Sequence, residues 1–205
     1  MINTIIFDFG DVFIDKNKDA KTKRFAELGL KDWPPALDNM ETMLETGRID
    51  ATTFLKGIQQ YIPTVSIDEI KEAWNLGIGE FPLYRLEFLQ KLAENYTLFL
   101  LSNTDPIHIE KFEQDTGESF YGDFYRCFEA VYFSHEIGHR KPAEEAFYYL
   151  INKHELQPKR TLFVDDKKYN TDAAETLGFQ IWNLEVGKED VVELFDKKII
   201  SPDEP

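Results

Sequence analysis

Five short apolar runs are the clearest pattern along this sequence. They cover residues 2–7, 96–101, 130–133, 161–164 and 179–184. Each run is nearly continuous, which is typical of a strand covered on both faces. Apolar residues at helical spacing lie between several runs, namely Leu83, Leu86, Leu89 and Leu92 before the second and Ala146, Phe147, Leu150 and Ile151 after the third. This alternation predicts an α/β fold, with a parallel sheet and helices on both faces.

The interval from residue 17 to residue 81 breaks the alternation, because it contains helical patterns and no convincing strand. Asp50 precedes an apolar stripe at helical spacing, so we expect it to cap a helix. Ser66 and Glu69 have the spacing of a capping box before another helix. We therefore predict a helical insertion between the first two strands. It would lie above the carboxyl edge of the sheet, where open α/β sheets bind ligands.

Length and charge narrow the range of functions. The 205 residues suit one domain, or a core domain with an insertion, and the 42% hydrophobic content supports a packed core. A net charge of −15 opposes binding to nucleic acid and to anionic membranes, so we expect neither as a partner. Because the charge also repels anionic substrates at long range, any phosphate site must be local and assisted by a metal ion.

Cysteine content and the lengths of the apolar runs indicate the compartment. Cys127 is the single cysteine, so no intramolecular disulfide can form, which fits a reducing compartment. We expect Cys127 to serve packing, with a nucleophilic role as the alternative. No signal peptide is expected, and no apolar run approaches the roughly 18 residues of a membrane span. These features predict a cytoplasmic protein.

Polar side chains follow four of the predicted strands. They are Asp8 after the first, Ser102 and Asn103 after the second, Lys141 after the third, and Asp165 and Asp166 after the fourth. Each alone has a structural explanation, as a turn residue, a helix cap or a solvated surface group. Because the carboxyl ends of parallel strands meet at one edge, we interpret the set as a functional site.

This combination of side chains suits a phosphoryl group bound beside Mg²⁺. Asp8, Asp165 and Asp166 concentrate negative charge, which a divalent cation with oxygen ligands relieves. Lys141 supplies a positive charge, and Ser102 supplies a hydroxyl donor. Asp8, acting as a nucleophile, would attack phosphorus and form an aspartyl-phosphate that water then hydrolyses.

These residues belong to four segments that resemble the haloacid dehalogenase (HAD) superfamily. The segments are FDFGDVFID, LLSNTD, GHRKP and FVDDKKYNTDAAETLG, in the order of that family. The resemblance covers nearly the whole chain and implies a Rossmann-like core of residues 1–16 and 82–205, with an α-helical cap of residues 17–81. The ETGRIDATTF segment and the DDxxxN form of the last segment resemble most the branch with glucose-1-phosphate phosphatases and epoxide-hydrolase N-terminal domains.

The resemblance also implies a Mg²⁺-dependent phosphatase that acts on a small phosphomonoester such as a sugar phosphate. By this resemblance, Asp8 is the nucleophile and a metal ligand, and Ser102 and Asn103 bind phosphate. Lys141 positions the phosphate and the nucleophile. Asp165 and Asp166 bind the metal. Which of the two adjacent aspartates ligates the metal directly is left open.

Gly10 occupies the position at which most phosphatases of this family carry a second aspartate, which protonates the leaving group. A glycine can still offer its backbone carbonyl to the metal, but it cannot be an acid. Either the enzyme works without that acid, or Asp11 replaces it with the help of the flexible Gly10. Absence of the acid favours substrates with good leaving groups, such as sugar 1-phosphates.

Two other functions fit part of this pattern. A metal-independent 2-haloacid dehalogenase also uses an aspartate nucleophile and needs no acid, but the pair Asp165 and Asp166 argues for a metal. A non-catalytic phosphate-binding regulatory module would keep the site without turnover. Assays for halide release and for hydrolysis of a reactive aryl phosphate separate these alternatives.

Overall fold

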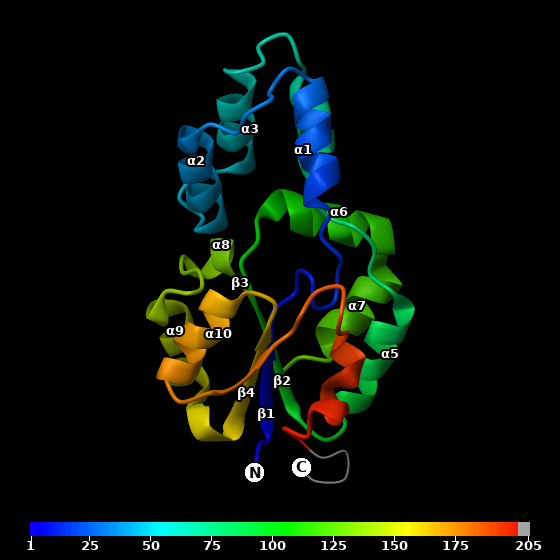
Figure 1. The fold of residues 1–205 in the computed structure, drawn as a ribbon, viewed down its shortest axis with the longest axis vertical. Coiled ribbons are helices and arrows are strands. Elements are labelled where there is room, and N and C mark those ends of the chain that lie inside the picture. The colour runs from blue at the N-terminus through cyan, green and yellow to red at the C-terminus, as the bar shows by residue number, and fades with distance from the viewer. Residues whose placement is uncertain (201–205) are drawn as a thin grey trace.

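A five-stranded parallel sheet forms the centre of the protein in the computed structural model, which describes residues 1–200 (Figure 1). The strands are β1 (Thr4–Phe7), β2 (Thr97–Ser102), β3 (Ala130–Phe133), β4 (Thr161–Asp165) and β5 (Gln180–Asn183), in the spatial order β3-β2-β1-β4-β5. The predicted α/β class and all five predicted strands are confirmed, with strand ends shifted by at most two residues.

Both faces of the sheet are covered, which explains why the apolar runs do not alternate. Ile5 and Phe7 of β1 point into one apolar cluster, and Ile6 points into another. The first cluster includes side chains from α5 (Leu83–Leu92), α7 (Glu118–Arg126) and η2 (Val191–Lys197), and the second includes side chains from α9 (Glu144–His154) and α10 (Lys168–Thr176). These two groups of helices lie on opposite sides of the sheet in Figure 1.

Three further elements lie between the strands. They are α6 (Pro106–Thr116), α8 (Ser134–Ile137) and η1 (Pro158–Arg160). In Figure 1, α6 and α8 lie at the carboxyl edge of the sheet, whereas the N-terminus lies at the opposite edge. Among the described residues, no helix has both the length and the apolar character needed to cross a membrane.

Four helices form a separate lobe beyond the carboxyl edge of the sheet (Figure 1). This helical lobe consists of α1 (Lys18–Glu27), α2 (Pro35–Glu45), α3 (Ala51–Gln59) and α4 (Ile67–Asn75). It has its own buried apolar cluster, which includes Leu37, Leu44, Phe54, Ile58 and Ile70. Asp50 caps α3 by accepting from Thr53 N at 2.7 Å, and Ser66 and Glu69 form the predicted capping box of α4.

The two chain segments that join the helical lobe to the sheet run side by side. Asn17 N donates to Gly77 O at 2.9 Å, and Gly79 N donates to Asp15 O at 2.7 Å. A Cβ atom at position 79 would lie 3.0 Å from that same carbonyl oxygen, so glycine permits this close approach. The paired linkers hold the base of the lobe beside the loop that follows β1.

Arg85 of α5 fixes this loop from the other side. Its guanidinium donates to Phe13 O at 3.0 Å and to Asp15 Oδ1 at 2.7 Å. Arg85 Nη2 also lies 2.9 Å from Oδ2 of Asp190, the residue just before η2. One half-buried arginine thus connects the strand-end loop, the first linker and the C-terminal part of the chain.

Candidate active site

The carboxyl ends of β1 and β4 bring three aspartates together. Phe7 pairs with Val164 across the sheet, and Asp8 N donates to Val164 O at 2.9 Å. Asp8 therefore lies beside Asp165 and Asp166, and each of the three offers a carboxylate oxygen within 4.8 Å of the others. The sequence prediction that these aspartates meet at one edge is confirmed in its geometry.

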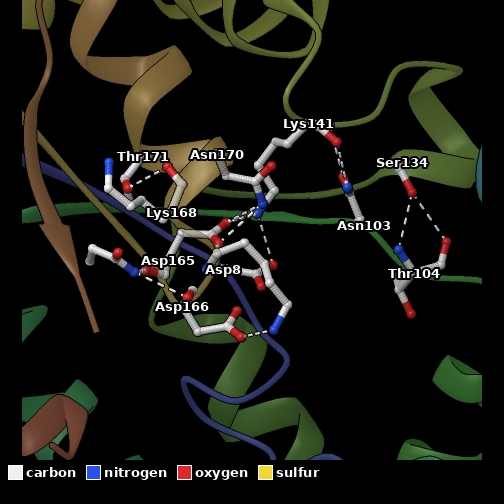
Figure 2. Close-up of polar contacts among 12 residues, drawn as sticks. Asp8, Asn103, Thr104, Ser134, Lys141, Asp165, Asp166, Lys168, Asn170 and Thr171 are labelled. Atoms are coloured by element: carbon white, nitrogen blue, oxygen red, sulfur yellow. Dashed lines mark hydrogen bonds and ion pairs between the residues drawn. The ribbon is translucent and has the colours of Figure 1, made fainter. Parts of the chain in front are cut away.

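Lys141 lies between two of these carboxylates (Figure 2). Its side chain is fully buried, and Nζ lies 2.6 Å from Asp165 Oδ2 and 2.9 Å from Asp8 Oδ1. Burial alone would lower the pKa of Lys141, but the carboxylates of Asp165 and Asp8 outweigh it and raise this pKa. The lysine is therefore a fixed positive charge at the base of the site.

Asp165 is bound on both oxygens. Oδ1 accepts from Lys167 N at 2.8 Å, Oδ2 accepts from Lys141 Nζ, and Asn170 Nδ2 donates to both oxygens at 3.1 and 3.0 Å. Burial raises the pKa of Asp165, and Lys141 opposes this rise. With this set of donors, Asp165 is better placed to orient Lys141 than to give an oxygen to a metal.

Asp166 has a different environment from its neighbour. Oδ2 is ion-paired with Lys167 Nζ, whereas Oδ1 is buried and has no hydrogen-bonding partner among residues 1–200. Burial raises the pKa of Asp166. A buried carboxylate oxygen without a donor, beside the Asp8 carboxylate, fits Mg²⁺, which takes oxygen ligands at short distance. Asp8 and Asp166 would hold the ion, with the Gly10 carbonyl as a further candidate ligand.

The end of β2 supplies the opposite wall of the site. Ser102 is buried at the strand end, and it lines a pocket together with Asn103. The amide of Asn103 accepts from Lys141 N at 2.9 Å and donates to Lys141 O at 2.7 Å. The Asn103 side chain therefore holds the loop of Lys141, as Figure 2 shows. Because both polar atoms of this side chain are engaged, only the backbone of Asn103 is left to contact phosphate.

Asp11 closes the turn after β1. It has a left-handed backbone with φ of 59°, a conformation that Asp and Asn tolerate better than most residues. Its Oδ1 accepts from Lys16 N at 2.9 Å, and its Oδ2 lies 3.8 Å from Lys167 Nζ. These contacts weigh against the alternative that Asp11 replaces an acid at position 10, because its carboxylate is engaged in the turn.

A pocket extends from the strand ends toward the helical lobe. Gly10, Ser102 and Asn103 are among its lining residues. Apolar side chains such as Ile78 and Ile109 also line it, together with five charged residues of the first linker and the helical lobe, namely Lys16, Lys18, Lys21, Glu41 and Glu45. These charged residues could not be recognised from the sequence, because surface charges on amphipathic helices have no distinctive spacing.

Two of these charged groups are held in place by neighbours. Glu45 Oε2 lies 3.0 Å from Arg140 Nη2, and burial raises the pKa of Glu45. Lys21 Nζ lies 3.9 Å from the centre of the Trp74 ring, and burial lowers the pKa of Lys21. The pocket thus offers both a carboxylate and an ammonium group from the helical lobe.

Asp105 connects the helical lobe to the core beside this pocket. It caps α6 by accepting from Ile107 N at 2.9 Å, and it accepts from Trp74 Nε1 at 3.2 Å. His108 Nδ1 lies 2.9 Å from the same carboxylate, and the imidazole stacks on the Trp74 ring at 5.2 Å. Burial would raise the pKa of Asp105, but His108 and the other donors lower it. These contacts make His108 a packing residue between α6 and the helical lobe.

Cys127 lies outside this site. Its thiol donates to Asp123 O at 3.3 Å, and burial raises its pKa to about 11. A thiol at neutral pH is a weak nucleophile. Packing is therefore the better of the two explanations for this cysteine.

Comparisons with known proteins agree with this geometry. A family model described as haloacid dehalogenase-like hydrolase matches residues 2–178. D-ribitol-5-phosphate phosphatase of Bacteroides thetaiotaomicron is 32% identical over 193 residues, which are 91% of this chain and 94% of the relative.

Solved structures give the same result. A HAD family enzyme of Bacteroides thetaiotaomicron, as an aspartate-to-alanine variant with magnesium and inorganic phosphate, is 30% identical with a TM-score of 0.87, over 95% of this chain and 99% of that one. A HAD-like family hydrolase of Porphyromonas gingivalis is 28% identical with a TM-score of 0.84, over 98% of this chain and 100% of that one. L-2-haloacid dehalogenase of Xanthobacter autotrophicus, 16% identical with a TM-score of 0.61 over 98% and 85% of the two chains, shares the fold alone.

Mg²⁺ should stabilise the folded protein through Asp166. At a concentration near 100 times its Kd, the ion should raise Tm by about 5–10 °C, because it binds the folded state and relieves repulsion among three carboxylates. Differential scanning calorimetry with Mg²⁺ and with EDTA measures this shift. Asp166→Asn should remove most of it, whereas Asp172→Asn on the exposed face of α10 should retain it. An equal shift in both variants would contradict the assignment.

Proposed function

The chain belongs to the haloacid dehalogenase-like hydrolase family, and from this premise we propose that it is a Mg²⁺-dependent phosphatase of small phosphomonoesters. The observation that carries the proposal is the cluster of Asp8, Asp166 and Lys141 at the carboxyl edge, with Ser102 at the end of the neighbouring strand β2. We further propose that residues 17–81 act as a cap on a core of residues 1–16 and 82–205.

Asp8 is the nucleophile in this proposal. One carboxylate oxygen attacks phosphorus, the bond to the leaving oxygen breaks, and an aspartyl-phosphate forms on Asp8. Water then attacks this intermediate and releases phosphate. The close contact between Asp8 Oδ1 and Lys141 Nζ, at 2.9 Å, fixes the carboxylate and leaves its other oxygen for the attack on phosphorus.

The remaining residues bind the phosphoryl group and neutralise its negative charge. Lys141 neutralises the equatorial oxygens of the phosphoryl group, and Ser102 donates its hydroxyl to them. Bound Mg²⁺ would add electrostatic stabilisation of the same oxygens and would align the phosphoryl group with Asp8. Asp165 keeps Lys141 oriented through the contact of 2.6 Å, so we assign it a positioning role.

The pocket toward the helical lobe favours a hydroxylated leaving group. Glu45 can accept hydrogen bonds from hydroxyls, and Lys21 can donate to them. The relative named for D-ribitol-5-phosphate acts, by that name, on a sugar-alcohol phosphate. We therefore propose a sugar or sugar-alcohol phosphate as substrate. We also propose a cytoplasmic reaction, since a chain with one cysteine needs no oxidising compartment.

A metal-independent dehalogenase remains the second candidate chemistry, and the aspartate cluster argues against it. Halide displacement by a carboxylate needs no cation beside the nucleophile, whereas Asp166 Oδ1 is buried and has no donor among the residues that the structure describes. Parallel assays of halide release from 2-haloacids and phosphate release from esters, each with EDTA or Mg²⁺, decide between the two. A non-catalytic module would show neither activity and would still bind phosphate.

Asp8→Asn should abolish phosphatase turnover without unfolding the protein. A carboxamide is a poor nucleophile, and loss of a covalent nucleophile lowers kcat by about three orders of magnitude or more. Phosphate release measures turnover, and circular dichroism reports the fold. Asp19→Asn on the exposed face of α1 is the matched control and should keep wild-type rate. Retention of a tenth of the activity by Asp8→Asn would refute the nucleophile assignment.

Asp11→Asn should keep kcat/KM within about threefold, because asparagine tolerates a left-handed backbone and can accept the Lys16 N–H. Asp11→Ala should lose the turn contact and lower the free energy of unfolding by about 1–2 kcal/mol. Urea denaturation and steady-state kinetics separate the two effects. A loss of about 100-fold or more in Asp11→Asn would identify Asp11 as the acid.

Glu45→Gln should weaken selection of the polyol part of the substrate. We expect KM for D-ribitol 5-phosphate to rise about tenfold, which corresponds to loss of one hydrogen bond to a charged group. KM for p-nitrophenyl phosphate, which lacks hydroxyls, should change less than about twofold. Glu72→Gln, an exposed residue of α4, serves as the control. Equal changes for both substrates would show that Glu45 acts on the fold of the lobe and not on the substrate.

A further inference from the structure

The side chain of Lys16 lies over Gly10 and fills the space that a side chain at position 10 would enter. A Cβ atom built on Gly10 would lie 2.5 Å from Lys16 Nζ and 3.1 Å from Lys16 Cδ, and it would overlap Cε. Lys16 and Gly10 line the same pocket as Ser102. The pocket wall next to Asp8 therefore presents an ammonium group where residue 10 has no side chain.

The backbone of Lys16 is held on two sides. Its N–H donates to Asp11 Oδ1 at 2.9 Å, and Lys16 pairs with Ile78 of the second linker. Lys16 Nζ forms no ion pair with the described residues. Its positive charge acts at longer range on the carboxylates of Asp166 and Glu45 and favours their ionised forms. Lys16 is thus an anchored residue with an available cation.

The expected reaction geometry brings the leaving group to this cation. In-line attack by Asp8 places the leaving oxygen on the far side of phosphorus. Because Asp8 and Lys141 form the base of the site, that oxygen points along the pocket toward the helical lobe. A sugar-alcohol phosphate leaves as a primary alkoxide, which is strongly basic. Gly10 carries no acid, and the Asp11 carboxylate is bound in its turn.

We propose that Lys16 is a catalytic residue whose ammonium group donates a hydrogen bond to the leaving-group oxygen. Asp8 forms a bond to phosphorus, the bond from phosphorus to the leaving oxygen breaks, and its electron pair goes to that oxygen. The positive charge of Lys16 stabilises the developing alkoxide, and a proton from solvent completes the alcohol. This inference rests on the proposed phosphatase function.

The dependence of kcat/KM on the leaving group tests the proposal. Lys16→Met should lower kcat/KM for D-ribitol 5-phosphate and for simple alkyl phosphates by about 10- to 100-fold, as expected for one charge-assisted hydrogen bond. For p-nitrophenyl phosphate, whose leaving group needs little stabilisation, the loss should stay within about threefold. A plot of log kcat/KM against leaving-group pKa should therefore become steeper in Lys16→Met.

Three controls define the role of the side chain. Lys16→Arg keeps the charge and should recover most of the alkyl-phosphate activity, while Lys23→Met on the exposed face of α1 makes the same charge change and should match wild type. Binding of inorganic phosphate with Mg²⁺, measured by calorimetry, should differ by less than about threefold between wild type and Lys16→Met, because phosphate has no leaving group.

The outcomes are distinct. An equal loss for aryl and alkyl substrates, or a parallel loss of phosphate binding, would make Lys16 a phosphate ligand and overturn the proposal. Unchanged activity of Lys16→Met on all substrates would overturn it as well. Absence of phosphatase activity in the wild-type enzyme would instead overturn the proposed function, which the same assay reports before any variant is compared.

Discussion

The buried ammonium group of Lys141 is the charge on which the site depends. Two carboxylates, from Asp8 and Asp165, lie within 2.9 and 2.6 Å of it. Carboxylates removed from water are costly unless a cation compensates them, and removing one partner of such a group is strongly destabilising. The β1 and β4 strands can end in adjacent acids only because the loop after β3 delivers this lysine. The reciprocal amide contacts of Asn103 hold that loop in place.

Two adjacent aspartates differ in their surroundings because their side chains contact different neighbours. Asp165, the last residue of β4, is fully buried among donors from Asn170 and the Lys167 backbone. Asp166, one residue later, has a buried oxygen to which no residue in the described range 1–200 donates. Asp165 ends the strand, whereas Asp166 lies in the bend that follows it. Asp165 therefore has its oxygens bound by protein donors, whereas Asp166 is the candidate metal ligand, although the two residues are identical and adjacent in the sequence.

Most of the fold and the central part of the site could be predicted from the sequence. Continuous apolar runs identify buried parallel strands, and the parallel arrangement brings Asp8 and Asp166 to one edge. The sequence could not distinguish Asp165 from Asp166, because the difference lies in long-range donors such as Lys141. It also could not identify Lys16 or Glu45, whose proposed roles depend on the placement of the helical lobe over the strand ends. Asp105 carried a recognisable signal, as a helix cap before Pro106, but its bond to Trp74 depends on tertiary packing.

The side-by-side linkers have a consequence for the history of such enzymes. Asn17 and Gly77 are hydrogen-bonded at 2.9 Å, so the lobe between them leaves and re-enters the core at nearly one point. An insertion with adjacent ends can lengthen, shorten or be exchanged without changing the register of the strands. The charged residues on the lobe can thus diverge while the aspartates and Lys141 stay fixed. A chimera that carries the lobe of a related protein between these two positions would keep the aspartates and Lys141 and would change the charged residues that line the pocket.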